Sequence, residues 1–598
     1  MAHGGRLSRR LTIAGLGCAL GLVLALMSPC SPSTAQTPRS IAGLPPERTD
    51  GRGADAPFIE YEAESAITDG VIIGPDRMFG TLAAEASGRR AVRLDATGQS
   101  VTVILDAPAN ALTVRASVPD ALTCRSGDTT LAVMAGDRRV GRLALTPCYG
   151  WFYGDYPFTN DAASGGAHHV YDHARLRLDD VLPTGTRLSL VMDSLSPAPW
   201  IVIDLIDVEL IDPPAPPPVG AVSVTEFGAD PTGGLSSLEA FKAAIAHGER
   251  HQRPVWIPPG DYRIEGHLSV DNVALIGAGP WWSELRGPGV GVFGQPAFMG
   301  GSRDVILRDF AIIGEVMDRV DEAPLNGVGG AFNQSLISNL FIQHTKAGLW
   351  LDGPFDGLMV TDLRILDQTA DAVNFHGGVT GSVVQNTFVR GTGDDGLAMW
   401  SHPTPNSGNV FRNNTVIAPV LANGIAIYGG ADITVTDNVI ADTVTRGGGL
   451  HLGARFDSIR VEGDIRFDRN AVIRSGSIDP VWGHGVGAVW LYALDQPLTG
   501  ARIRIKDTEI LDSTDVAFQV LGKTIDGLTI DGARIEGPAA GVLQIRAPGD
   551  AVLREIEVLD LRGPAIEDRN GAFRLHDGGG HSGWSLIDRD GRGPAPAP

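Results

Sequence analysis

A short repeat runs through the middle of the chain and limits what the chain can fold into. Runs rich in β-branched residues, such as LMVTDLRIL and SVVQNTFV, recur with a period in the low twenties and are separated by Gly, Asn and Asp. This period is typical of a parallel β-helix, in which each coil adds one strand to each sheet. The sequence therefore predicts an all-β fold with a parallel β-helix over residues 221–580.

The start of the repeat region predicts how the β-helix is closed. Residues 236–250 place Leu238, Phe241 and Ile245 on one face, which indicates a single amphipathic helix. This helix and the VWIPPGDYRI segment after it resemble the opening of pectin-lyase-like right-handed β-helices, where a short helix covers the N-terminal edge. The resemblance implies right-handed coils. It does not choose among the lyases, hydrolases and tailspikes that share the fold.

Asparagines recur at one bend of successive repeats. Asn386, Asn414 and Asn438 follow similar strands, and the last two are 24 residues apart. A ladder of buried asparagines would satisfy backbone groups that have no strand partner in the turns. We therefore interpret these residues as structural rather than catalytic.

Two acidic clusters lie within the repeats, in TADAVNFHGG and GTGDDG. Asp371 and Asp394 are 23 residues apart, so we expect them at equivalent places on neighbouring coils, roughly 4.8 Å from each other. Asp395 follows directly, and Gly393 and Gly396 allow a bend that turns both carboxylates outward. Stacked carboxylates repel one another, which indicates a role in proton transfer. From spacing alone, an Asp-rich turn without chemistry is the alternative.

Composition narrows the range of partners. The 598 residues include 48 bases and 70 acids, for a formal charge of −22, with 77 glycines and only 6% aromatic residues. Abundant glycine suits a turn-rich β protein, and the length predicts more than one unit. Such an acidic chain disfavours nucleic acid, anionic membranes and polyuronates. We expect a monomer that binds a neutral ligand.

The N-terminus predicts export. Three arginines precede an apolar run, and small residues follow, so residues 1–35 form a predicted signal peptide that is cleaved after Ala35. The mature protein would be secreted, either extracellular or periplasmic, and would carry no membrane anchor.

Four cysteines are present, and two of them, Cys18 and Cys30, lie in the signal region. We expect the other two, Cys124 and Cys148, to form a disulfide, since the predicted compartment is oxidising. Two separately buried thiols are the alternative.

The segment before the repeats predicts a β-sandwich. Residues 57–212 contain a series of short strands with alternating apolar residues, and the proline-rich residues 213–220 form a linker. The YEAE start and the VIDLIDVE end resemble carbohydrate-binding modules of families 6 and 35. The resemblance implies a structural calcium bound by Glu62, Glu64 and Asp204. Solvated acids on a strand face are the alternative.

Two further features concern how this module and the tail are packed. An insertion at residues 149–173 concentrates aromatic residues, among them Trp151, Tyr156 and His168, which either stack on sugars or pack against the neighbouring domain; we favour packing. Removal of residues 1–218 should then leave a folded β-helix, and loss of folding would show that the module is integral. Residues 581–598, rich in Pro and Gly, form a predicted disordered tail.

Five segments of the repeats together resemble glycoside hydrolase family 87, the α-1,3-glucanases and mycodextranases: NGVGGAFNQSLISNLFIQHTKAGLWLDGP, TADAVNFHGGVT, GTGDDGLAMW, LANGIAIYGG and RGGGLHLG. The similarity extends over about residues 57–453. It implies that Asp371, Asp394 and Asp395 are the catalytic aspartates of an inverting hydrolase of neutral α-glucans with α-1,3 linkages. The resemblance implies no cofactor for catalysis, and it leaves open which aspartate is acid and which is base.

Ring-bearing residues surround the GDDG segment. Trp400 follows it directly, His376 lies one coil earlier, and Tyr428 and His451 lie on what look like the same faces of the next two coils. Flat rings along a groove would stack on glucose units, so we expect these four residues to bind substrate. An aromatic stack inside the coil is the alternative.

Two other functions stay open at this stage. A polysaccharide lyase or polygalacturonase on the same fold would cleave pectin or another uronate polymer, and a non-catalytic β-helix would bind glucan without releasing sugar. Lys346 is the only lysine between Lys242 and Lys506, which disfavours a lyase, because uronates require basic side chains. Arginines such as Arg364 and Arg390 weaken that argument.

Overall fold

The computed structural model describes residues 41–44, 48–49, 51–479 and 484–586. Ser40–Pro598 forms one compact unit. The predicted signal peptide, residues 1–35, lies outside the described residues. Within the described residues, no helix is both long and apolar enough to cross a membrane.

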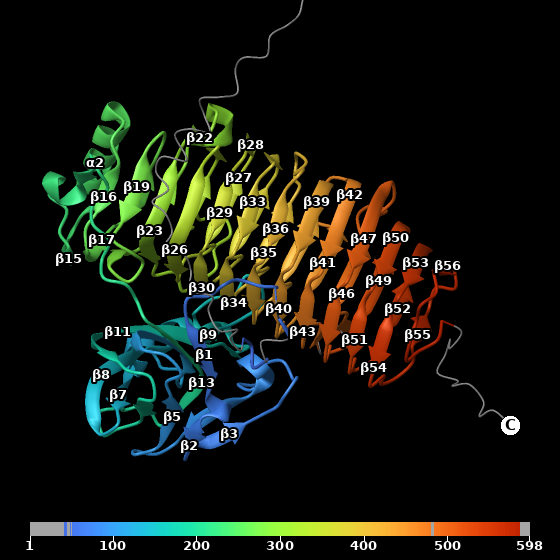
Figure 1. Ribbon diagram of the computed structural model, residues 1–598, viewed down its shortest axis with the longest axis horizontal. Helices are drawn as coiled ribbons and strands as arrows, with labels where there is room; N and C mark the ends of the chain where they lie inside the picture. Colours follow the sequence, from blue (N-terminus) through green and yellow to red (C-terminus); the bar gives the residue numbers. More distant parts are fainter. Residues whose placement is uncertain (1–40, 45–47, 50, 480–483, 587–598) are drawn as a thin grey trace, which may run out of the picture. The chain divides into compact units, whose positions relative to one another are not determined.

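The described chain begins with two antiparallel sheets that enclose one hydrophobic core (Figure 1). The first sheet has the order β11-β6-β13-β4-β3 with β1 paired to β13, and the second has the order β2-β5-β12-β7-β8. The strands of the first sheet are β11 (Asp172–Leu182), β6 (Ala109–Ser117), β13 (Ile201–Glu209), β4 (Ala91–Leu94), β3 (Val71–Ile73) and β1 (Ile59–Glu62). Those of the second are β2 (Ile67–Thr68), β5 (Ser100–Ile104), β12 (Arg187–Val191), β7 (Thr129–Ala135) and β8 (Arg138–Leu145). Every residue of β13 is buried, so both faces of this strand are covered.

A disulfide joins Cys124 and Cys148. The two cysteines lie in short turns that precede β7 and follow β8, so the bond closes the hairpin formed by these strands.

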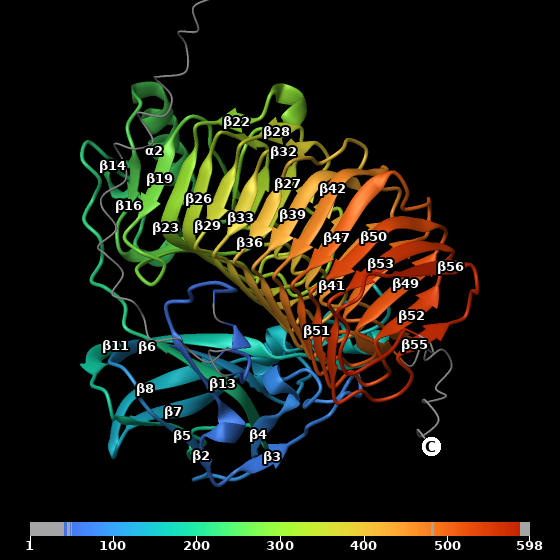
Figure 2. The same ribbon diagram turned by 45° about the vertical axis from the view of Figure 1, so that its right-hand side comes forward.

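A parallel β-helix follows, from β14 (Val222–Ser223) to β56 (Phe573–Asp577), as Figures 1 and 2 show. The helix α2 (Leu238–His251) covers its first coils and buries Phe241 and Ile245. The prediction of an all-β chain with parallel strands is confirmed.

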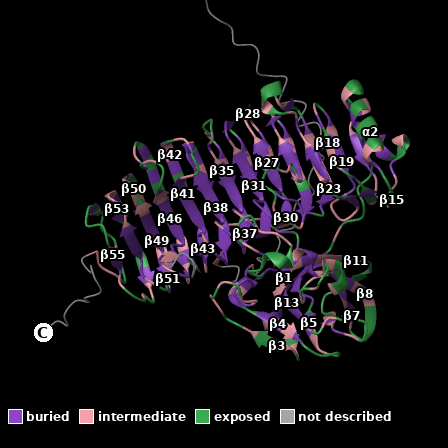
Figure 3. Ribbon diagram, turned by 180° about the vertical axis from the view of Figure 1, so that it is seen from behind, coloured by how far each residue is buried: buried purple, intermediate pink, exposed green. Residues whose placement is uncertain are grey.

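Two parallel sheets run along the β-helix, one of 25 strands and one of 12. The 12-stranded sheet consists of β18 (His267–Ser269), β21 (Gly291–Phe293), β24 (Val328–Gly330), β27 (Leu349–Asp352), β31 (Val373–His376), β35 (Leu397–Trp400), β38 (Ile425–Tyr428), β41 (Leu450–Ala454), β46 (Val489–Ala493), β49 (Phe518–Gly522), β52 (Leu543–Arg546) and β55 (Ile566–Asp568). Strands of the larger sheet that matter below are β20 (Ser283–Arg286), β23 (Ile306–Ile313), β26 (Leu336–Gln343), β30 (Arg364–Gln368), β34 (Phe388–Thr392) and β42 (Val461–Asp468). Alternate residues enter one continuous core, such as Phe375 in β31 and Met399 in β35, and Figure 3 shows these strands as buried.

The asparagine ladder is present, but Asn386 is not part of it. Asn414 N donates to Asn438 Oδ1 at 2.9 Å, and Asn438 N donates to Asn470 Oδ1 at 3.0 Å. On the preceding coil the equivalent position is Thr387, whose N donates to Asn414 Oδ1 at 3.1 Å. The prediction for Asn386 is therefore wrong by one residue, because that side chain lies at the exposed corner before the ladder position.

Two columns of left-handed residues mark the corners of the larger sheet. The first includes Asp309, Asn339, Asp362, Asn386, Asn413 and Asp437, with φ between 47° and 65°. The second includes His344, Asp367, Asp442 and Asp512, with φ between 49° and 57°. Asp and Asn tolerate this conformation better than other residues with a Cβ, which explains why acids recur at the corners.

Buried ion pairs join the first two sheets to the β-helix. Arg390 of β34 pairs with Asp207 at 2.9 Å and with Glu60, and all three side chains are almost completely buried. Arg364 of β30 pairs with Glu209 at 2.8 Å. Burial raises the pKa of Glu60 to about 7, although the Arg390 charge opposes this shift. These contacts contradict the expectation of a detachable module, because removing the first sheets would leave buried charges without partners.

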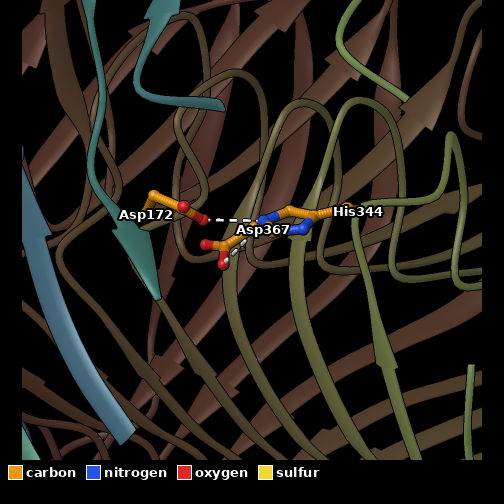
Figure 4. Close-up of side chains that lie close together, drawn as sticks. All are labelled: Asp172, His344 and Asp367. Carbon is orange, nitrogen blue, oxygen red and sulfur yellow. Dashed lines mark hydrogen bonds and ion pairs between the residues drawn. The ribbon is translucent and has the colours of Figure 1, made fainter. Parts of the chain in front are cut away.

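A second buried network crosses the same interface (Figure 4). His344 Nε2 lies 2.7 Å from Asp172 Oδ1, and His173 Nδ1 lies 2.7 Å from Asp367 Oδ1. Gln343 Nε2 donates to Asp367 Oδ2 at 2.8 Å. Burial raises the pKa of Asp172 to about 6, whereas His173, opposing burial, helps to lower the pKa of Asp367 to about 2. Because these groups satisfy one another, we assign the network to the packing of the two parts.

The end of the described chain packs against the last coils. Trp584 Nε1 donates to the Ile556 carbonyl at 3.1 Å, and Trp584 contacts the core of the β-helix. The predicted disordered tail is therefore wrong for residues 581–586, and residues 587–598 lie outside the described part.

Replacing Arg390 with Met should lower the free energy of unfolding by about 3–5 kcal/mol, because Glu60 and Asp207 would stay buried without a cation. The measurement is urea denaturation followed by circular dichroism. Arg412→Met is the control, since Arg412 is exposed on the same sheet and bonds only to Gln385. Equal, small losses in both variants would contradict a structural role for the buried pairs.

Candidate active site

A cavity of about 640 Å³ opens on the outer face of the 12-stranded sheet. Its walls come from the turns before β31, β35 and β38, from the loop between β23 and β24, and from the insertion in the first two sheets. The residues that matter below are Tyr156, Arg319, Lys346, Trp350, Asp371, Asn374, Asp394, Asp395, Trp400, Asn423, Tyr428 and Phe456.

The register of the coils brings the predicted aspartates together, although not in the expected order. Val373 of β31 pairs with Leu397 of β35, which is an offset of 24 residues. Asp371 therefore stacks on Asp395, and Ala372 N donates to the Asp395 carbonyl at 3.2 Å. The expectation that Asp371 and Asp394 are equivalent is wrong, because the local repeat is 24 residues long and not 23.

The three carboxylates nevertheless converge. One oxygen from each of Asp371, Asp394 and Asp395 lies within 4.8 Å of the others. The bend that allows this requires the flanking glycines: a Cβ on Gly393 would lie 2.4 Å from the Thr369 carbonyl oxygen, and a Cβ on Gly396 would lie 2.4 Å from a methyl group of a neighbouring valine. The close approach of the coils, rather than an unusual φ, thus fixes these glycines.

Burial favours the protonated forms of the two stacked acids. Asp371 is 5% exposed and accepts a hydrogen bond from Asn374 Nδ2 at 2.7 Å. Burial, together with the charges of Asp394 and Asp395, raises the pKa of Asp371 well above its ordinary value. Burial and the charge of Asp394 likewise raise the pKa of Asp395 to about 7.

Asp395 is held by three donors. Asn423 donates to Oδ1 from its backbone N and from Nδ2, both at 2.8 Å, and Tyr428 Oη donates to Oδ2 at 2.9 Å. Asn423 occupies the position equivalent to Asp395 on the next coil. The column of stacked positions thus supplies both the acids and the group that orients one of them.

Asp394 is the most exposed of the three acids and is paired with a cation. Arg319 Nη2 lies 2.7 Å from Asp394 Oδ2, and Arg319 also pairs with Asp321 at 2.8 Å. The Arg319 side chain is 8% exposed and donates to the Gly393 carbonyl at 3.2 Å. This arginine fixes both the side chain of Asp394 and the backbone beside it.

The first two sheets contribute directly to the cavity. Tyr156 Oη donates to Asp321 Oδ2 at 2.6 Å and accepts from Arg319 Nη2 at 3.0 Å. Elsewhere in the insertion, Phe152 packs against Val420 of the β-helix. The aromatic insertion therefore packs against the β-helix, as favoured, and Tyr156 also lines the cavity.

The predicted substrate-binding rings divide into two groups. Trp400 and Tyr428 line the cavity, and His376 stacks on Trp400 with centroids 4.7 Å apart but is not among the lining residues. His451 is 0% exposed and stacks on Trp490 at 3.9 Å. The structure contradicts a substrate contact for His451, because His451 pairs in register with Ala426, two residues before Tyr428, and is covered.

Several lining residues were not predicted. Arg319 and Tyr156 come from segments without repeats, so no periodicity could have indicated them. Phe456 is 52% exposed, and its carbonyl accepts a hydrogen bond from Trp400 Nε1 at 3.0 Å. A large exposed aromatic residue after a strand end, next to RF in HLGARFDS, was the available signal.

The predicted calcium ligands fit a metal only in part. Asp204 already accepts from Arg115 Nη1 at 2.5 Å and from Ser87 N at 3.0 Å. Glu62 Oε2 and Glu64 Oε2 are buried without a hydrogen-bond partner. The two glutamates therefore suit a cation, whereas Asp204 is directed at a guanidinium.

The fold and the site together define a class of protein. A parallel β-helix that presents converging carboxylates beside aromatic rings is suited to cleavage of glycosidic bonds. Two family models match the chain: α-1,3-glucanase catalytic domain D1 at residues 55–211 and domain D2 at residues 235–538.

Solved structures agree with these matches. The catalytic unit of a thermostable family 87 α-1,3-glucanase from Streptomyces thermodiastaticus strain HF3-3 is 41% identical, with a TM-score of 0.81, over 90% of this chain and 98% of that chain. A family 87 α-1,3-glucanase catalytic domain in complex with tetrasaccharides is 25% identical, with a TM-score of 0.79, over 89% of this chain and 100% of that chain. No match was found among curated proteins. The chain belongs to glycoside hydrolase family 87 and is a glycoside hydrolase.

The buried acid should make stability depend on pH. A carboxyl whose pKa is raised by folding loses stability as pH rises from about 4 toward its folded value, because ionisation is disfavoured in the folded state. Asp371→Asn removes this cost. The variant should therefore unfold at an equal or higher temperature than the wild type, with a gap that widens by at least about 1 °C between pH 5 and pH 8.

Calorimetry at the two pH values measures this gap. Asp179→Asn is the control, since Asp179 is exposed in β11. A lower Tm for Asp371→Asn with the same gap at both pH values would show that Asp371 is charged and stabilising.

Proposed function

We propose that the protein hydrolyses α-1,3-glucosidic bonds in a neutral α-glucan. The observation that carries the proposal is the convergence of Asp371, Asp394 and Asp395, with one oxygen of each within 4.8 Å, in a 640 Å³ cavity beside Trp400. Support comes from the 41% identical structure, which is an α-1,3-glucanase, and from the relative solved with tetrasaccharides.

The mechanism follows from where the proton is held. Glycoside hydrolysis requires one carboxylic acid to protonate the leaving oxygen and one carboxylate to take a proton from water. In the free enzyme the stacked pair Asp371 and Asp395 holds the proton, because burial raises the pKa of both. Arg319 balances the charge of Asp394. The C1–O bond breaks, water oxygen bonds to C1, and the departing hydroxyl receives the acid's proton.

We propose that the reaction inverts the anomeric centre. Inverting enzymes place water between the base and the sugar, with the working carboxyls roughly 6.5–9.5 Å apart, whereas retaining enzymes have them about 5–5.5 Å apart. Acids stacked on neighbouring coils are closer than the inverting range, so we assign to them the joint binding of one water. Asp394 lies beside this stack rather than in it, which leaves room for the sugar. The family resemblance supports inversion.

Each single Asp→Asn change at these three positions should lower kcat at least about 10²-fold, because general acid–base catalysis contributes about 10²–10⁴ in rate. The assay is release of reducing ends from insoluble α-1,3-glucan. Asp352→Asn is the matched control, since Asp352 lies on the same outer face in β27 and bonds to His376 but does not line the cavity. Near-normal turnover by Asp394→Asn would remove Asp394 from the mechanism.

The stereochemical course provides an independent measurement on the same reaction. NMR of the first-formed product from an α-linked substrate should show the β-anomer, and the α-anomer would establish retention instead. Cleavage of pectin but not of α-1,3-glucan would favour a lyase or polygalacturonase, and binding without sugar release would favour a non-catalytic β-helix.

We also propose that the protein is secreted. The predicted signal peptide at residues 1–35 supports export, and the Cys124–Cys148 disulfide is the kind of bond that persists in an oxidising compartment.

We propose that Glu62 and Glu64 bind a structural calcium. Burial raises the pKa of Glu62 well above its ordinary value and that of Glu64 to about 7, and a divalent cation would hold both carboxylates in the charged form. Dialysis against EGTA at pH 7.5 should therefore lower Tm, and added Ca²⁺ should restore it. The Glu62→Gln variant should show no response to EGTA, and a wild type that is equally unresponsive would contradict the metal.

A further inference from the structure

A second cavity, of about 450 Å³, lies where the linker crosses the β-helix. It is formed by the end of β13 and the linker after it, by residues 54–57, and by corners of the 25-stranded sheet. None of its lining residues lines the catalytic cavity. Its volume lies within the range of about 300–1,000 Å³ that is usual for ligand pockets, which occur preferentially at domain interfaces.

Two tryptophans form its apolar wall. Trp281 and Trp282 are half-buried and precede β20. The guanidinium of Arg175 lies 4.2 Å from the centroid of the Trp281 ring, and that of Arg177 lies 4.0 Å from the Trp282 ring. Trp282 Nε1 also donates to the Asp212 carbonyl at 3.0 Å. These contacts hold the rings in place, and rigid aromatic surfaces contribute contact area at a low cost in conformational entropy.

The opposite wall is a row of planar polar groups. Asn339 Nδ2 donates to Asp309 Oδ1 at 2.7 Å, and Asn386 Nδ2 donates to Asp362 Oδ1 at 2.5 Å. All four residues belong to the first left-handed corner column, so the backbone places one amide or carboxylate per coil. A carboxamide has two N–H donors and a carbonyl, and a carboxylate accepts about four hydrogen bonds, so each pair keeps capacity for hydroxyl groups.

A buried donor lies at the base of the cavity. Arg364 lines it, and the Arg364 side chain is 7% exposed. Nη1 is bound to Glu209 at 2.8 Å, whereas Nη2 has no hydrogen-bond partner. A buried N–H without a partner costs about 1–3 kcal/mol, and a ligand oxygen would remove that cost.

Charge excludes other ligands. The cavity wall carries five carboxylates and one guanidinium, which repels polyanions such as uronates. Among the described residues, these carboxylates do not form a group whose oxygens all lie close enough to hold one metal ion. Hydroxyl groups of a neutral sugar fit both the polar row and the aromatic wall.

We propose that this cavity, the linker cleft, is a second binding site for a neutral glucan chain. The choice of glucan as ligand rests on the proposed function. A second site on the same rigid unit would keep an insoluble chain near the catalytic cavity after each cleavage, which raises its effective concentration there.

The experiment uses the full chain carrying Asp394→Asn, so that the glucan is not consumed. Binding to insoluble α-1,3-glucan is measured by sedimentation for Trp281→Ala and for Asn339→Gly in this background. Each change should weaken binding about 2–10-fold, as expected for the loss of one aromatic or polar contact. The matched control is Asn413→Gly, since Asn413 occupies the same corner column but does not line the cleft, and glycine tolerates the φ of 51°.

Activity is measured separately, with Asp394 intact, on short soluble oligosaccharides, and there the two cleft variants should match the wild type. Unchanged glucan binding in both cleft variants overturns the proposal, as does an equal loss in Asn413→Gly. If the wild type fails to hydrolyse α-1,3-glucan while binding still depends on Trp281 and Asn339, the proposed function fails and the cleft stands.

Discussion

Backbone hydrogen bonding between successive coils determines where every side chain of the active site lies. The 24-residue offset between β31 and β35 stacks Asp371 on Asp395, and the next coil adds Asn423 to the same column. Two nearly buried carboxylates at this spacing disfavour each other's ionisation, which is the source of their raised pKa values. The apolar core inside the coils is continuous on both sides, so the fold tolerates this local cost.

The geometry of the site also depends on the first two sheets. Arg319 connects Asp394 to Tyr156, and the Arg319 backbone N donates to the Phe158 carbonyl at 3.2 Å. The sheets have their own hydrophobic core, yet their interface with the β-helix contains ion pairs such as Arg390–Asp207. An interface of this kind requires close geometric matching, because a displaced partner would leave a buried charge. The two parts therefore act as one rigid support for the acids.

The repeat sufficed to predict the parallel coils and the acids they bring together, but a period is uncertain by one residue. That uncertainty assigned Asp394 rather than Asp395 to the stack, and Asn386 rather than Thr387 to the ladder. His451 failed for a related reason, since coils of 25 and 28 residues adjoin one another and shift the alignment. Arg319 could not be predicted at all. Its partners lie 74 and 163 residues away, and only the folded chain relates them.

The arginines bear on which polysaccharide the protein accepts. Arg364 and Arg390 weakened the argument from sequence against an anionic substrate, because a uronate could use them. In the structure both are buried and paired with carboxylates of the first sheets, and Arg319 is paired with Asp394 and Asp321. A guanidinium already neutralised by a buried acid offers little attraction to a second anion. These arginines therefore serve the structure and the orientation of Asp394, which favours a neutral glucan over a uronate polymer.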